Sequence, residues 1–168
     1  SGCAVNRATA SADPSLRWDS IKSLHVKQLE GEDGSTKKLI AEKLRANGFK
    51  VSADPEPNVQ VDAVVTYVDR WMWDMTMYML ELTVVVREPK SDFPLATGNS
   101  FHTSLTRKSP KEMVDEVIDN ILKQRRTPIS RQDLMERLKC SQATLYRLVT
   151  ELRDFLGAPI EQDADSRG

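Results

Sequence analysis

The chain has 168 residues, of which 39% are hydrophobic and 29% charged, and its formal net charge is −1. These values are typical of a soluble globular protein with one domain, or with one small domain and a helical appendage. No apolar run approaches the roughly 20 residues that a membrane-spanning helix needs.

The net charge hides an uneven distribution along the chain. Residues 1–122 carry 15 basic and 18 acidic side chains, and residues 154–168 carry 1 and 4. Residues 123–153 carry 8 basic and 3 acidic side chains, which gives this segment a charge of +5. Such a segment suits a surface that meets the phosphates of nucleic acid, although a solvated helical face has the same composition.

The first residues, Ser1-Gly2-Cys3, place a small residue and a glycine before a cysteine. This order matches the end of a bacterial lipoprotein signal, in which the cysteine receives the lipid, and Cys3 is therefore a candidate lipidation site. So short a match also arises by chance. Residues 1–19 are rich in Ala, Ser and Thr without periodicity, and we expect them to form a flexible tether.

Residues 20–122 predict an α+β domain with the order β-α-β-β-β-α. Strands are expected at 21–26, 59–67, 74–87 and 95–105, and helices at 35–47 and 110–123. The three consecutive strands are expected to form an antiparallel meander, with the helices over one face of the sheet.

The segment around residues 69–77 breaks the alternation. A break is expected at 69–73, and the strand after it carries apolar residues on one face in its first half and on the other face in its second half. Either both faces are covered or a β-bulge switches them. Trp71, Trp73, Met75 and Met77 suit a groove for a partner or ligand, because Met and Trp adapt to varied surfaces. Packing of these residues in the core is the alternative.

Residues that carry catalysis are not gathered anywhere in the sequence. His25 and His102 are the only histidines, and neither has a carboxylate or cysteine at ligand spacing. Ser100 and Ser104 have no identifiable base partner, and no glycine-rich loop follows a strand. The two cysteines are far apart and form no metal or redox motif. We therefore expect no enzyme, no cofactor and no metal.

Three helical patterns follow one another between residues 110 and 156. The first is the closing helix of the α+β domain. The second is expected from Ser130 to about residue 138, and after a tight turn Ser141 caps the third. The inward stripe of the third helix is expected to contain Leu145, Val149, Leu152 and Leu156. Two short helices joined by such a turn form a helix-turn-helix.

In a helix-turn-helix, the N-terminal end of the last helix enters the major groove of DNA. Arg147 is expected to contact a guanine edge or a phosphate, and Gln142 an adenine edge. The other candidate DNA-binding residues are Arg131, Lys139, Ser141, Thr144 and Tyr146. The alternative is that the helix pair only packs on the α+β domain.

The helix-turn-helix module, residues 112–168, is expected to share the helix 112–123 with the α+β domain. This helix is apolar on two stripes, which is typical of a helix buried between two layers. The residues expected to face the sheet are Val114, Val117 and Ile121. Ile118 and Leu122 are expected to face the helix-turn-helix, at Leu134, Leu138 and Leu145. The two modules would then be rigidly coupled.

The C-terminal part resembles the N-terminal DNA-binding domain of bacterial WYL-domain transcriptional regulators. The resemblance rests on Arg131-Gln132-Asp133-Leu134, on 140–147 with its Ser141-Gln142-Ala143-Thr144-Leu145-Tyr146-Arg147 string, and on 151–160. It implies a winged helix-turn-helix whose third helix reads DNA. Leu148 replaces an acidic residue that is frequent in the family, and we expect a truncated wing with its first strand at 160–162.

Residues 3–122 resemble small proteobacterial envelope lipoproteins of unassigned function. The segments that carry this resemblance are 1–3, 67–75, 96–100 and 104–110. A lipidated Cys3 implies a periplasmic, membrane-anchored protein, whereas a DNA reader stays in the cytoplasm.

We therefore expect a non-enzymatic DNA-binding protein, in which a transcription-regulator-like helix-turn-helix is fused to a lipoprotein-like domain. The alternative is an envelope lipoprotein whose C-terminal helices are a packing or interaction element. The expected partners are double-stranded DNA, a membrane bound through a lipid anchor, and a second copy of the chain in a homodimer.

Overall fold

The computed structural model divides the chain into two compact units, Ser1–Arg126 and Thr127–Gly168. It describes residues 5–52, 60–125 and 141–156, and within the last range it leaves out the side chains of Gln142, Leu145, Phe155 and Leu156. Each unit is described by itself.

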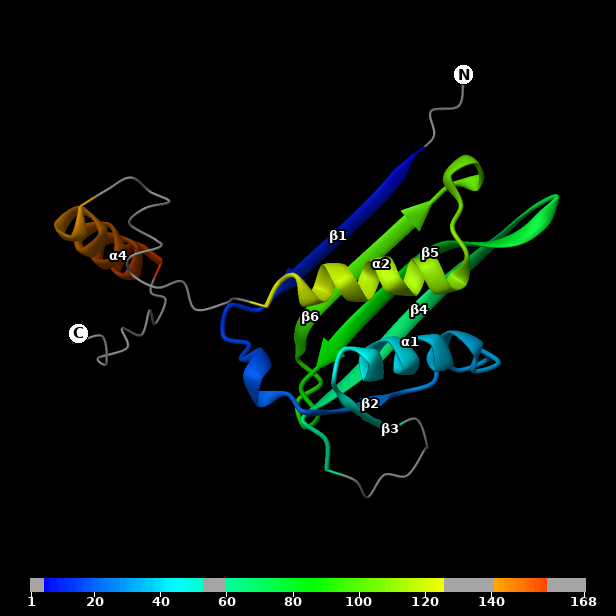
Figure 1. The fold of residues 1–168 in the computed structure, drawn as a ribbon, viewed down its shortest axis with the longest axis horizontal. Coiled ribbons are helices and arrows are strands. Elements are labelled where there is room, and N and C mark those ends of the chain that lie inside the picture. The colour runs from blue at the N-terminus through cyan, green and yellow to red at the C-terminus, as the bar shows by residue number, and fades with distance from the viewer. Residues whose placement is uncertain (1–4, 53–59, 126–140, 157–168) are drawn as a thin grey trace. The chain divides into compact units, whose positions relative to one another are not determined.

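The first unit is a six-stranded sheet with the strand order β1-β6-β5-β4-β2-β3. Its strands are β1 (Asn6–Ala12), β2 (Ser23–Val26), β3 (Lys50–Ser52), β4 (Ala63–Asp74), β5 (Thr76–Arg87) and β6 (Pro94–His102). β4, β5 and β6 form the expected antiparallel meander, and β2 pairs in parallel with both β3 and β4. The helices α1 (Ser35–Ala46) and α2 (Pro110–Leu122) cover one face of the sheet (Figure 1). The predicted α+β class is thus confirmed.

The N-terminal segment differs from the expected tether. Residues 6–12 form β1, which pairs antiparallel with β6 from Asn6 opposite His102 to Ala12 opposite Ala96. An edge strand needs little apolar alternation, because the ladder of backbone hydrogen bonds holds it on one side. Ala10 and Ala12 pack against the core, and their small size explains why a composition poor in large apolar residues still forms a strand.

The hairpin β4–β5 also differs from prediction, because no break occurs at 69–73. β4 continues to Asp74, and the two strands stay paired up to Asp74 opposite Thr76. The register shifts where Arg70 pairs with Glu81 but Trp71 pairs with Met79, which leaves Leu80 as an extra residue in β5. This β-bulge switches the faces, so that both Met79 and Leu82 are buried.

The helix α2 starts at a complete capping box. The Ser109 side chain accepts a hydrogen bond from the Glu112 backbone N–H, the Glu112 carboxylate accepts one from the Ser109 N–H, and Pro110 occupies the first turn. Neither α1, α2 nor α4, the helices that the structure describes, is long and apolar enough to cross a membrane.

Both apolar stripes of α2 lie in the core of the first unit. Met113, Val114, Val117, Ile118 and Ile121 are all buried. β6 approaches α2 so closely that a Cβ at Gly98 would lie 2.7 Å from Cγ1 of Ile121. α1 packs beside α2, with an ion pair of 3.0 Å between Lys43 and Asp119. The prediction that Ile118 and Leu122 also face the helix-turn-helix stays a prediction, since most of the proposed partner residues lie outside the described ranges.

Candidate functional site

The helix α4 (Gln142–Leu156) is the described part of the predicted reading module. Ser141 precedes it, and its Oγ accepts a hydrogen bond of 3.3 Å from the backbone N–H of Thr144 and lies 2.9 Å from Thr144 Oγ1. This is the geometry of an N-cap, as predicted from the sequence. In general, the N–H groups of a helix's first turn that have no partner within the helix are the groups that can bind an anion.

The first two turns of α4 bring together four of the seven predicted DNA-binding residues. Ser141 is exposed and Thr144 half-buried at the start of the helix. One turn further, the Tyr146 side chain is 54% exposed, and Arg147 beside it is exposed as well. Together they present hydroxyl groups and a guanidinium group within one short segment. Arg131, Lys139 and the side chain of Gln142 lie outside the described residues, as does the predicted wing.

The apolar stripe of α4 is less covered than expected. Leu152, expected on the inward side, is 50% exposed, and Leu148 is exposed as well. At 100° per residue these two leucines lie toward one margin of the stripe, whereas the half-buried Val149 lies closer to its opposite margin. Residues 141–156 contain two arginines and two carboxylates, so the positive charge of the 123–153 segment comes mainly from the residues before α4.

The Trp- and Met-rich segment forms the tip of the β4–β5 hairpin. Trp73 is 70% exposed and Met75 86% exposed, and Trp71 and Met77 are exposed too. The alternative of core packing is therefore wrong for these residues. These residues are exposed because β4 and β5 are long and continue past the helices that cover the sheet (Figure 1). The predicted role of these residues in binding a partner stays a prediction.

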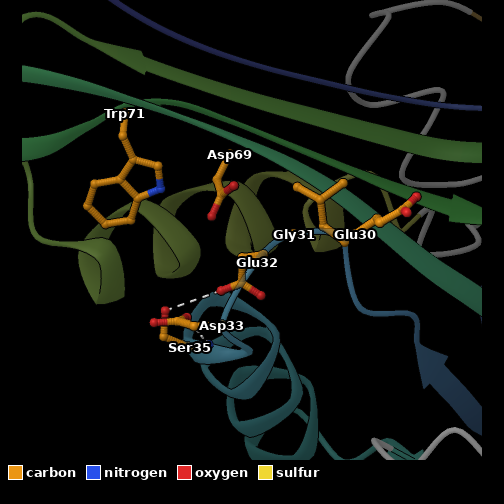
Figure 2. A pocket seen from close by; sticks show the side chains of 8 residues that line it. Glu30, Gly31, Glu32, Asp33, Ser35, Asp69 and Trp71 are labelled. Atoms are coloured by element: carbon orange, nitrogen blue, oxygen red, sulfur yellow. Dashed lines mark hydrogen bonds between the residues drawn. The ribbon is translucent and has the colours of Figure 1, made fainter.

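A pocket of about 510 Å³ lies between this hairpin and the start of α1, as Figure 2 shows. Trp71 and Asp69 contribute from β4, and the other lining residues are Leu29, Glu30, Gly31, Glu32, Asp33 and Ser35. The best-connected carboxylate of this pocket, Glu32, holds the loop in place through hydrogen bonds. Glu32 accepts hydrogen bonds from the Tyr67 hydroxyl (2.6 Å) and from the N–H groups of Gly34 and Thr36.

The loop that carries Glu32 also shifts the pKa of a titratable group, the Tyr67 hydroxyl. Burial and, after it, the hydrogen bond to Glu32 raise the pKa of the Tyr67 hydroxyl above its usual range, so Tyr67 stays neutral. The residues that the structure describes contain no group of three or more His, Cys, Asp or Glu side chains arranged to hold a metal ion.

A buried polar cluster that sequence reasoning missed joins β6 to α2. One oxygen of Glu116 accepts a hydrogen bond from Ser100 Oγ and lies 2.8 Å from His102 Nε2, and the other lies 2.8 Å from Lys108 Nζ. The sequence showed no carboxylate at ligand spacing from His102 and no base partner for Ser100, whereas the structure places Glu116 against both. The partners are 14 and 16 residues apart on a strand and a helix, so no short spacing could reveal them.

The geometry of this cluster is structural rather than catalytic. Ser100 and His102 both bond to Glu116, and neither bonds to the other as an activated nucleophile and its base would. Ser100 and His102 are both buried. Burial raises the pKa of Glu116, but the hydrogen bonds from Lys108, Ser100 and His102 outweigh it and lower this pKa to about 2.

Comparison with known proteins assigns the C-terminal segment. Residues 117–167 match the family model of the HTH domain. This match supports a helix-turn-helix module in the C-terminal part of the chain. The match begins inside α2, so the last turns of α2 belong both to the first unit and to the matched segment. No curated protein matches the chain.

Solved structures are similar to the fold of the chain. The PelC dodecamer from Paraburkholderia phytofirmans is 16% identical, with 73% of this chain and 100% of that chain covered and a TM-score of 0.52. A variant of the same PelC with one leucine replaced by methionine is 14% identical, with 70% and 97% covered and the same TM-score. At this identity the likeness shows the fold alone. A minor lipoprotein from Acinetobacter baumannii is 18% identical, with 62% and 90% covered, and has a TM-score of 0.33, which is too low to support an argument.

Proposed function

We propose that this protein binds double-stranded DNA through its helix-turn-helix, with α4 as the helix that enters the major groove. The observation that carries the proposal is the Ser141-capped start of α4, where Tyr146 and Arg147 are exposed inside a segment that matches the HTH domain. A helix with a capped, exposed N-terminal end and polar side chains on its outer face suits major-groove contacts.

Each exposed side chain has a role that fits its chemistry. The Arg147 guanidinium can donate two parallel hydrogen bonds to a guanine edge. Ser141 and Thr144, with the first N–H groups of the helix, suit a phosphate. The basic residues that precede α4, Arg131 and Lys139 among them, supply further phosphate contacts, because α4 alone carries no net charge.

The proposal predicts that Arg147→Ala weakens binding to the preferred duplex by roughly 1–3 kcal/mol, if Arg147 reads a base edge. The wild-type affinity should also fall steeply as salt rises, because phosphate contacts release counterions. Fluorescence anisotropy with duplexes selected from a broad random pool measures both effects. Arg70→Ala, which removes an exposed arginine of the first unit, is the control and should leave the affinity unchanged. Absence of binding to every duplex at low salt would rule the proposal out.

A second candidate function is that of a lipid-anchored envelope protein. Cys3 is favoured as the anchor because β1 begins only three residues after it, so a lipid there would hold the sheet close to a membrane. Stable anchoring requires more than one acyl chain, as a fully processed lipoprotein has.

The two candidates are separated by expression of the chain with its natural upstream residues. If Cys3 is acylated, the membrane fraction should hold the wild type much more strongly than Cys3→Ser. Mass spectrometry of the N-terminal peptide detects the lipid directly. Equal partitioning of the two forms, without added mass on Cys3, would exclude the anchor and leave DNA binding as the proposed activity.

A further inference from the structure

Exposed apolar side chains in the first unit are gathered at one end of the sheet. Among the described residues of this unit, the large exposed apolar side chains at this end are Val5, Trp71, Met72, Trp73, Met75, Met77 and Leu105. Val68 lies just before them on β4, and Phe93, between β5 and β6, belongs to the opposite end. Scattered single apolar residues need no explanation, but the gathering of so many at one end of the sheet points to an interaction site.

The sheet topology explains why these residues meet. β4 ends where β5 begins, and β6 ends where β1 begins, since Asn6 lies opposite His102. The short helix η2 (Ser104–Thr106), which carries Leu105, is held against the hairpin by bonds from Ser104 to Asp74 and from Arg107 to Thr76 (2.9 Å). Val5 joins this end because its carbonyl accepts a hydrogen bond of 3.3 Å from Thr103 N–H.

The backbone at the apex indicates that the side chain there matters. Met75 closes the hairpin with a φ of 60°, in the left-handed region where glycine or asparagine is the easier choice. The chain nevertheless places a methionine at this position, and it is 86% exposed. A residue that contributes only a turn would not need an apolar side chain of this length.

We propose that this end of the sheet docks on the surface of a phospholipid bilayer, with the tip Trp71–Met77 inserted at the level of the headgroups. Trp is enriched at this level because its ring is apolar and its N–H is polar. Flexible Met side chains at the apex fill the irregular space among acyl chains. The hairpin projects past the helices, so the first unit itself does not obstruct contact with a flat surface (Figure 1).

Two features favour a bilayer over a charged protein or nucleic acid as the occupant. Arg107 is paired within the chain with Asp74, and Arg70 shares Glu81 with Arg7, so much of the positive charge near the tip is compensated. Cys3 precedes Val5 by two residues, a reach of at most about 7 Å, so a lipid on Cys3 would enter a membrane at this same end. The acidic residues of the neighbouring pocket favour a zwitterionic over an anionic surface.

The inference goes beyond the proposed DNA binding and does not require lipidation, so its test uses the full chain with Cys3→Ser. Sedimentation with neutral phosphatidylcholine vesicles measures partitioning and avoids attraction between the basic segment and anionic lipid. We expect Trp73→Ser/Met75→Ser to lower the partition coefficient about ten-fold or more. Phe93→Ser, at the opposite end, should leave it unchanged. Because all three side chains are exposed, circular dichroism should show the same folded signal for every variant.

Fluorescence provides the geometric part of the test. Brominated lipid should quench the wild-type protein, whereas a Trp71→Phe/Trp73→Phe variant, in which only Trp18 emits, should bind without quenching. The guanidinium carbon of Arg125, a residue that follows α2, lies 6.0 Å from the centre of the Trp18 ring. Trp18 therefore lies at the C-terminal end of α2, away from the hairpin. Equal partitioning of the wild type and the Trp73→Ser/Met75→Ser variant would overturn the proposal. The proposal would also be overturned if the wild type did not bind vesicles and the tip instead mediated self-association. Self-association would appear as a molecular mass that rises with concentration in the wild type but not in Trp73→Ser/Met75→Ser.

Discussion

Replacing Ile121 with alanine should lower the free energy of unfolding of the first unit by about 2–5 kcal/mol. Ile121 is buried where α2 crosses β6, and its Cγ1 and Cδ1 occupy the space above Gly98. The truncation therefore opens a cavity that the sheet backbone cannot fill. Chemical denaturation followed by circular dichroism measures the change. Leu105→Ala, which shortens an exposed aliphatic side chain, is the control and should change the stability by no more than about 0.5 kcal/mol.

Gly98 offers an independent check on this packing. Gly98→Ala alone should destabilise the protein, because its Cβ would lie 2.7 Å from Ile121 Cγ1. In the Ile121→Ala background the added methyl group enters the vacated space, so its effect should become smaller. Additive effects of the two substitutions would contradict the contact.

The Ile121→Ala variant also tests whether α2 is shared between the two units. If it is, hydrogen exchange should show protection lost together in the sheet and in α4, because both would then pack on the same helix. Protection lost in the sheet alone, or in α4 alone, would show that the two units unfold independently.

The predictable parts of the fold are those with strong local signals. The helix α2 was predicted from about Pro110 because a periodic apolar run follows this residue, and the structure adds a capping box of Ser109 and Glu112 at the same position. The meander β4–β6 followed from alternation, and even the bulge in β5 was one of two predicted outcomes. β1 was missed because an edge strand of small residues has no apolar period and depends on β6 for its hydrogen bonds.

In the candidate sites, too, features with a local sequence signal were predicted and features that depend on tertiary packing were not. The cap at Ser141 was predicted from residue types alone and is confirmed. The exposure of Trp73 and Met75 was not predicted, because composition does not reveal how far a hairpin extends past the helices that cover its sheet. The Glu116 cluster was also missed, since it depends on how α2 lies on β6 and therefore on tertiary packing.

Glu116→Gln should lower the free energy of unfolding at pH 7 by about 2–4 kcal/mol. The carboxylate is largely shielded from solvent and joins Lys108, Ser100 and His102, so its removal leaves a cation and two buried polar groups with poorer partners. Nδ1 of His102 already has no hydrogen-bond partner among the described residues, so the ring depends on its contact with Glu116. Urea denaturation of the wild type and the variant measures the difference.

The dependence of this difference on pH identifies its cause. Hydrogen bonds lower the pKa of Glu116 from 4.5 to about 2, so its contribution is fully present above about pH 5 and is lost as the pH falls toward 2. The gap in stability between wild type and Glu116→Gln should therefore shrink steadily over that window. Asp115→Asn removes a neighbouring carboxylate that pairs with Lys111 and, at 3.7 Å, with Lys43, and it should cost no more than about 1 kcal/mol. A gap that stays constant from pH 5 to pH 2 would mean that the ionised carboxylate does not stabilise the cluster, and that Glu116 contributes through packing alone.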